Sequence, residues 1–130
     1  MAKKILIADD EFNIVRLLST RLQANGYEVV LAYEGNQAFE MAVKEKPDLI
    51  LLDFNMPGSK GTGVLEKLKA TNQVSRIPVI FVTAFTDDET RNKVIEMGAC
   101  DFIGKPFDPE DVLKKIKKAL AEITTDKEVK

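Results

Sequence analysis

The sequence contains no histidine and only one cysteine, Cys100, among its 130 residues. The lack of histidine excludes a serine–histidine catalytic triad, a phosphohistidine carrier and most catalytic zinc sites. One cysteine cannot form an internal disulfide, which is typical of a reducing compartment. Because it follows Ala99, we expect Cys100 to be a small buried apolar residue. Any chemistry in this chain must therefore depend on carboxylates, hydroxyl groups and lysine.

Long hydrophobic runs and a strong charge excess are missing as well. No apolar run is long enough to form a signal-peptide core or to cross a bilayer, and the net charge is only −2. A mildly acidic chain does not suit binding to a phosphate backbone, so we expect no direct nucleic-acid partner. These absences predict a cytoplasmic protein with no membrane insertion.

The composition is that of one globular domain, with 45% hydrophobic and 31% charged residues. The length of 130 residues also fits one domain. The last residues are polar and contain no apolar spacing. We therefore predict a single domain over residues 1–123 and a polar tail over 124–130.

Five short apolar runs recur along the chain. They are continuous and do not alternate with polar residues, which is typical of strands buried on both faces of a parallel sheet. The runs are Ile5–Ala8, Val29–Ala32, Leu49–Leu52, Val79–Val82 and Phe102–Ile103.

The stretches between these runs carry apolar residues at helical spacing, so each predicts a helix with one face against the sheet. Gly26 and Gly98 stand where helices would end. Thr86 and Glu89 form a capping-box pattern at one helix start, and Asp108 with Pro109 marks another. Strand and helix alternate five times, which predicts an α/β fold: a doubly wound, flavodoxin-like parallel sheet in the order 2-1-3-4-5.

Acidic residues follow two strands that this order makes neighbours. Asp9 and Asp10 follow the first strand, and Asp53 follows the third. The carboxyl ends of such strands line the crevice where these folds bind ligands. Carboxylates brought this close repel one another unless a cation neutralises them, and an all-oxygen cluster suits Mg²⁺. We therefore expect a magnesium site here.

Two further strand ends add a hydroxyl group and an ammonium group. Thr83 ends the fourth strand, and Lys105 follows the fifth. Both can reach an anion lying over the carboxylates, where the lysine supplies a point charge to phosphate. The Lys105–Pro106 bond also permits a cis peptide.

These residues together resemble response-regulator receiver domains of the CheY-like superfamily, and the resemblance covers nearly the whole chain. The segment Leu51–Gly58 resembles the phosphoacceptor signature of that family, and Gly61 matches its later glycine. The residues that carry the resemblance, each at the end of its own strand, are Asp9, Asp10, Asp53, Thr83 and Lys105–Pro106.

The resemblance implies a set of metal ligands. Asp10 and Asp53 would bind Mg²⁺ through their side chains, with Asp9 close by. Asn55 would contribute its backbone carbonyl.

The resemblance also implies a phosphorylation switch of a two-component system. Asp53 would accept a phosphoryl group from the phosphohistidine of a histidine kinase or phosphotransfer protein. Thr83 and Lys105 would bind the phosphoryl oxygens, and Phe102 would be the aromatic switch residue. The chain would catalyse only its own phosphorylation and dephosphorylation, and would not be an enzyme otherwise. A downstream effector protein would read the surface of the fourth helix, fifth strand and fifth helix.

Three positions depart from the commonest pattern of the family. Lys60 stands where an acidic residue is frequent, and Phe102 replaces a tyrosine. Phe85 puts a bulky group near the site, where we expect it to slow loss of the phosphoryl group.

Two other functions are compatible with this fold class. An aspartyl-nucleophile phosphatase would need an acid two residues after Asp53, where this chain has Asn55. A flavin-binding module would need a hydroxyl-rich loop after the first strand, where the sequence Asp9-Asp10-Glu11 would repel phosphate. Both remain alternatives to the switch.

Overall fold

The computed structural model describes residues 2–54, 56, 58, 60–84 and 87–129, with side chains through Ala121. The described residues form five strands and five helices that alternate along the chain. The strands are β1 (Lys4–Ala8), β2 (Glu28–Ala32), β3 (Leu49–Asp53), β4 (Val79–Thr83) and β5 (Asp101–Gly104). The helices are α1 (Phe12–Ala24), α2 (Gly35–Glu45), α3 (Gly61–Ala70), α4 (Asp88–Glu96) and α5 (Pro109–Val129).

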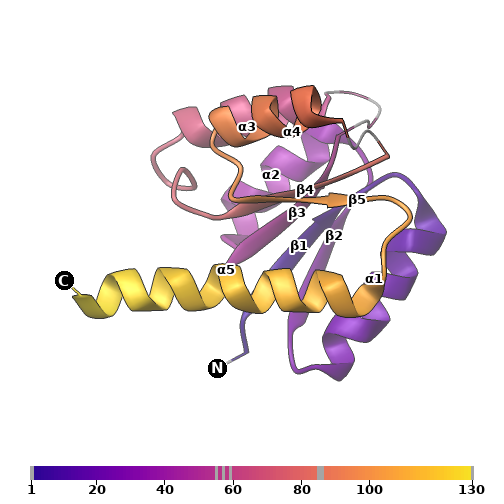
Figure 1. Cartoon of the computed structure of the whole chain (residues 1–130), viewed down its shortest axis with the longest axis horizontal. Coiled ribbons are helices and arrows are strands. Elements are labelled where there is room, and N and C mark those ends of the chain that lie inside the picture. Colours follow the sequence, from indigo (N-terminus) through magenta and orange to yellow (C-terminus); the bar gives the residue numbers. More distant parts are fainter. Residues whose placement is uncertain (1, 55, 57, 59, 85–86, 130) are drawn as a thin grey trace.

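The strands form one parallel sheet in the order β2-β1-β3-β4-β5, which confirms the predicted topology. Helices α1 and α5 cover one face of the sheet, and α2, α3 and α4 cover the other (Figure 1). Parallel neighbouring strands need a crossover connection, and these crossovers are right-handed. Because the chain moves in one direction from β1 to β2 and in the other from β2 to β5, the helices lie on both faces of the sheet.

Each face of the sheet has its own apolar core. On one side, Leu18 and Leu22 of α1 and Ile116 of α5 pack against inward residues of the strands. On the other side, Ala38 of α2 and Leu65 of α3 pack against alternate residues of the same strands. Strands β1, β3 and β4 are buried on both faces, and this explains why their apolar runs are continuous.

The residues observed at the helix ends can be compared with the start and stop residues predicted from the sequence. Gly26 and Gly98 have φ angles of 88° and 108°, so both follow helices in the left-handed region as predicted. Pro109 is the first residue of α5, also as predicted. The capping-box prediction for α4 was wrong, because Asp87 caps this helix by accepting a hydrogen bond from the backbone N–H of Thr90 at 2.9 Å.

Cys100 is exposed, which corrects the prediction that it is buried. Its neighbour Ala99 is only 5% exposed and packs in the core beside α4. Both residues lie in the connection between α4 and β5, where the chain buries Ala99 and leaves Cys100 exposed.

Helix α5 continues to Val129, so the backbone of residues 124–129, which we predicted as a polar tail, is helical. In the part of the chain that the structure describes, no helix combines the length and the apolar character that a membrane span requires.

Candidate functional site

The sheet register brings the predicted site residues to one edge. Ala8 of β1 pairs with Leu52 of β3, so Asp9 and Asp53 each lie one residue beyond this pair. Asp53 in turn pairs with Val82 of β4, which directly precedes Thr83. Adjacent parallel strands therefore bring these three side chains together, although they are far apart in the sequence.

Asp9, Asp10 and Asp53 offer carboxylate oxygens that all lie within 4.8 Å of one another. Asp9 and Asp53 are buried, with exposed fractions of 3% and 6%, whereas Asp10 is exposed. Buried like charges this close are unfavourable without a positive partner. Hard oxygen ligands around one point, with an open side toward solvent, fit a Mg²⁺ ion that keeps some of its waters.

Lys105 is a positive partner for this cluster. Its Nζ lies 3.0 Å from Asp9 Oδ2 and 3.5 Å from Asp53 Oδ1. It lies still closer to Glu11, with 2.7 Å between Nζ and Oε1. The lysine side chain is 12% exposed, so its ammonium is largely withdrawn from water and depends on these carboxylates.

The charge state of Lys105 follows from two opposing effects. Burial alone would lower the pKa of its ammonium. Hydrogen bonds to Glu11 and Asp9, together with the negative charges of Asp9 and Asp53, outweigh burial and raise the pKa above its ordinary value of 10.5. The ammonium is therefore fully protonated at neutral pH.

The backbone of Lys105 forms a hydrogen bond with the end of β4. The N–H of Lys105 donates to the carbonyl of Thr83 at 2.7 Å, and the Lys105–Pro106 peptide is cis. Thr83 is 1% exposed at the end of its strand. The structure thus brings the predicted hydroxyl and ammonium groups to the same sheet edge as the carboxylates.

Gly61 at the start of α3 allows the chain to pass very close to the site. A Cβ atom at this position would lie 2.4 Å from the carbonyl oxygen of Asp53 and 2.8 Å from Cε1 of Phe81. The N–H of Gly61 also donates to the carbonyl of Phe54 at 2.9 Å. A side chain at Gly61 would push against the backbone that carries the central carboxylate, so only glycine fits without a shift.

Phe102 lies inside the core on the side of α4, with an exposed fraction of 9%. It pairs with Phe81 across β4 and β5. Lys115 of α5 holds the same strand by donating to the carbonyl of Phe102 at 3.0 Å and by contacting Asp101 Oδ1 at 3.1 Å. Phe102, which we predicted as an aromatic switch residue, therefore points inward in this structure.

Asn55 and Phe85 lie outside the described residues, so their predicted roles remain predictions. Glu11, in contrast, is a site residue to which the sequence analysis gave no role of its own. The available signal was its position directly after Asp9 and Asp10 at a strand end. Its contact with Lys105 joins residues separated by 94 positions and becomes visible only in the fold.

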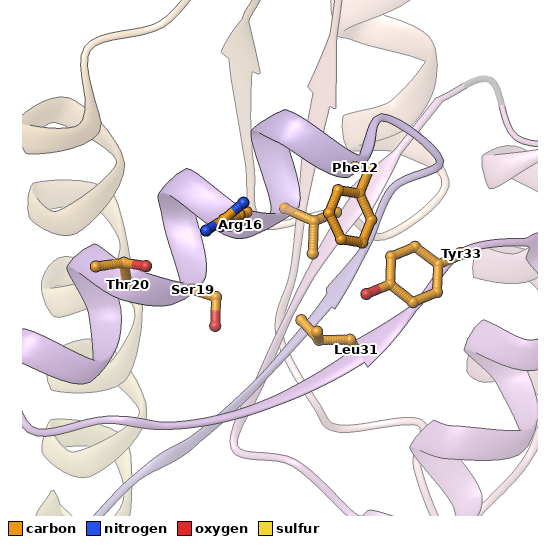
Figure 2. A pocket seen from close by; sticks show the side chains of 7 residues that line it. Phe12, Arg16, Ser19, Thr20, Leu31 and Tyr33 are labelled. Atoms are coloured by element: carbon orange, nitrogen blue, oxygen red, sulfur yellow. The ribbon is translucent and has the colours of Figure 1, made fainter.

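A hollow of about 140 Å³ lies between α1 and β2, and none of these carboxylates lines it. Figure 2 shows Phe12 and Tyr33 side by side at one end of it. Their rings stack with centroids 6.2 Å apart, and Phe12 is 62% exposed. The remaining lining residues are Val15, Arg16, Ser19, Thr20 and Leu31.

Comparison with known proteins identifies relatives of the whole fold. Residues 5–117 match the family model for the response regulator receiver domain. The chain is 42% identical over 122 residues to the alkaline phosphatase synthesis transcriptional regulatory protein PhoP of Bacillus subtilis, covering 92% of this chain and 49% of that protein. The chain spans about half the length of the curated relatives it matches.

Solved structures agree with this match. A response regulator receiver domain protein (CheY-like) from Methanospirillum hungatei is 32% identical with a TM-score of 0.89, covering 97% of this chain and 99% of that one. The chemotaxis response regulator CheY4 of Vibrio cholerae is also 32% identical, with a TM-score of 0.86 and coverage of 91% and 98%. From the family match, these relatives and the shared fold, we conclude that this chain belongs to the response regulator receiver domain family.

Proposed function

We propose that this receiver domain is a phosphorylation switch in which Asp53 accepts a phosphoryl group from the phosphohistidine of a sensor histidine kinase or phosphotransfer protein. The observation that supports this most directly is the contact of the Lys105 ammonium with both Asp9 and Asp53 at one edge of the sheet. A buried lysine beside an acidic cluster is suited to bind an anion that is built onto one of the carboxylates.

In the proposed transfer, a carboxylate oxygen of Asp53 attacks the phosphorus of the donor. The phosphorus–nitrogen bond of the phosphohistidine breaks, and the electron pair leaves with the imidazole, which takes up a proton. The product is an aspartyl phosphate. Loss of the group is the attack of water on the same phosphorus, which releases inorganic phosphate and restores the carboxylate of Asp53. Apart from these two reactions on its own side chain, the domain is not expected to act as an enzyme.

The side chains around Asp53 have separate roles in this proposal. Asp10 and Asp53 would hold Mg²⁺ with Asp9 nearby, and the backbone carbonyl of Asn55 would complete the protein ligands. When bound, this ion supplies positive charge to the phosphoryl oxygens during transfer. Lys105 pairs with one phosphoryl oxygen, and the hydroxyl of Thr83 donates a hydrogen bond to another, so both stabilise the negative charge of the group during transfer.

The signal would leave the domain through α4, β5 and α5. Thr83 moves toward the new phosphoryl group, and the space behind it favours the inward position of Phe102. Since Phe102 lies inward in this structure, the switch is a change in how often this position is occupied. Coupling of this kind amounts to about 1–3 kcal/mol, so a downstream effector protein that binds the α4–β5–α5 surface would also favour phosphorylation.

The relatives suggest the wider context of this switch. The match with PhoP of Bacillus subtilis, named a transcriptional regulatory protein, suggests that this domain controls a response of similar kind. Direct contact of this domain with nucleic acid is not part of the proposal, since its net charge is −2. We also propose that residues 1–123 form the receiver domain and that the protein lies in the cytoplasm.

Incubation with acetyl phosphate and Mg²⁺ tests the proposed acceptor. Intact mass should show one added phosphoryl group on the natural protein and none on Asp53→Asn. Asp88→Asn is a matched control, because it makes the same change at an exposed residue at the start of α4 and should be labelled normally. Label that persists undiminished on Asp53→Asn would mean that the acceptor lies elsewhere.

A further inference from the structure

Glu11 contacts the ammonium group of Lys105, which pairs with a phosphoryl oxygen in the proposed function. Of the three carboxylates around Lys105 Nζ, Glu11 lies nearest at 2.7 Å, against 3.0 Å for Asp9 and 3.5 Å for Asp53. Glu11 also stands at the N-cap position of α1, yet its side chain caps no backbone N–H of that helix. Its carboxylate reaches across to Lys105.

The three carboxylates differ in how easily they can release the ammonium. The side chains of Asp9 and Asp53 are only 4% and 7% exposed, so losing Lys105 would leave them charged and poorly hydrated. The Glu11 side chain is 56% exposed and can be solvated by water when the contact breaks. Of these three carboxylates, Glu11 is therefore the one whose contact with Lys105 can be broken at the lowest cost.

We propose that Glu11 is a positioning residue that competes with the phosphoryl group for Lys105 and so limits phosphorylation of Asp53. This inference rests on the proposed function, in which Lys105 pairs with a phosphoryl oxygen. To do so the ammonium has to give up part of its contact with Glu11. This competition opposes phosphorylation, so removal of the Glu11 charge should favour it.

Glu11→Gln tests the competition with little change in shape. The rate of labelling by acetyl phosphate, measured by intact mass at saturating Mg²⁺, should rise about threefold, the size expected for loss of a partly exposed ion pair. The affinity for beryllofluoride, a phosphoryl mimic, should rise by a similar factor. Glu110→Gln is the matched control, because Glu110 is 57% exposed, pairs with Arg21 and loses the same charge. It should label at the natural rate.

A Lys105→Ala background tests whether the effect passes through the lysine. There Glu11→Gln should change the labelling rate and the beryllofluoride affinity by a factor close to one, because the competition has been removed. An equal acceleration in that background, or in Glu110→Gln, would overturn the inference in favour of a general charge effect. A rate for Glu11→Gln equal to or below the natural one would overturn it as well.

The outcome for the natural protein separates this inference from the proposed function. If the natural protein takes no label at Asp53, the proposed function fails and the competition fails with it. If Asp53 is labelled and Glu11→Gln is not faster, only the role of Glu11 is wrong.

Discussion

The close approach of α3 to β3, the strand that carries Asp53, predicts the effect of Gly61→Ala. The new methyl group would lie 2.4 Å from the Asp53 carbonyl oxygen, 2.8 Å from Phe81 Cε1 and 3.0 Å from the Cα of Phe54. Nonbonded atoms of this kind settle near 3.5 Å, so the first contact alone requires a shift of about 1 Å. Two of the three contacts are with backbone and the third is with a fully buried ring, so none can simply rotate away.

The magnitude follows from two opposing contributions. Overpacking costs about 1–3 kcal/mol, and the rigid neighbours of Gly61 favour the upper end of that range. Alanine in a helix gains about 0.8 kcal/mol over glycine. The free energy of unfolding should therefore fall by about 2 kcal/mol, which lowers the Tm by about 8 °C in a domain of this size. Denaturant and thermal unfolding, followed by circular dichroism, measure both quantities.

Gly63→Ala provides the control within the same helix. A Cβ atom at Gly63 would have nothing within 4 Å, so the same chemical change should stabilise the protein by about 0.4–1 kcal/mol. The two variants should therefore shift the Tm in opposite directions. The acetyl phosphate reaction should slow in Gly61→Ala, where the strain falls on the Asp53 backbone, and not in Gly63→Ala. A Gly61→Ala protein as stable as the natural one would refute the close-packing argument.

Four further outcomes are expected. Asp10→Asn should weaken Mg²⁺ binding by at least about tenfold in a titration, and equal affinity would contradict its role as a ligand. For Lys105, a raised pKa in the folded protein means that its stabilisation is complete below pH 10.5 and is lost as the pH rises further. The stability difference between the natural protein and Lys105→Ala should thus stay level from pH 7 to about 10 and shrink above it, and a difference that grew would contradict the sign. Beryllofluoride should shift backbone NMR signals in α4, β5 and α5, whereas shifts confined to the acidic pocket would argue against this output surface. Phe85→Ser should shorten the half-life of the phosphorylated protein, and an unchanged half-life would count against shielding by Phe85.

The apolar runs predicted the strands well because burial on both faces leaves little choice of residue. The first and last residues of each predicted strand differ from those of the observed strand by at most one residue. For example, the predicted run Leu49–Leu52 lies inside β3. The strand order then brought Asp9, Asp53 and Thr83 to one edge, since the carboxyl ends of parallel strands meet there. The order of the strands was therefore sufficient to predict that these three residues lie together.

The parts that the sequence did not predict depend on where single side chains point. The partner of Glu11 lies 94 residues away and is chosen by side-chain reach, which no local pattern encodes. In the connection between α4 and β5, Ala99 is buried and Cys100 is exposed, and no local pattern indicated which of the two small residues would lie inside. At α4, Thr86 and Asp87 are both residue types that cap helices, so the sequence alone did not distinguish between them, and Asp87 is the observed cap.

The sheet separates the apolar core into two layers, one on each of its faces. Phe102 of β5 belongs to the layer of α2, α3 and α4, whereas the next residue, Ile103, belongs to the layer of α1 and α5. Replacements confined to different layers share few contacts, so their effects on stability should add, while replacements of contacting residues within one layer should not. Each layer could therefore be redesigned on its own, with the strands of the sheet as the elements that have to satisfy both.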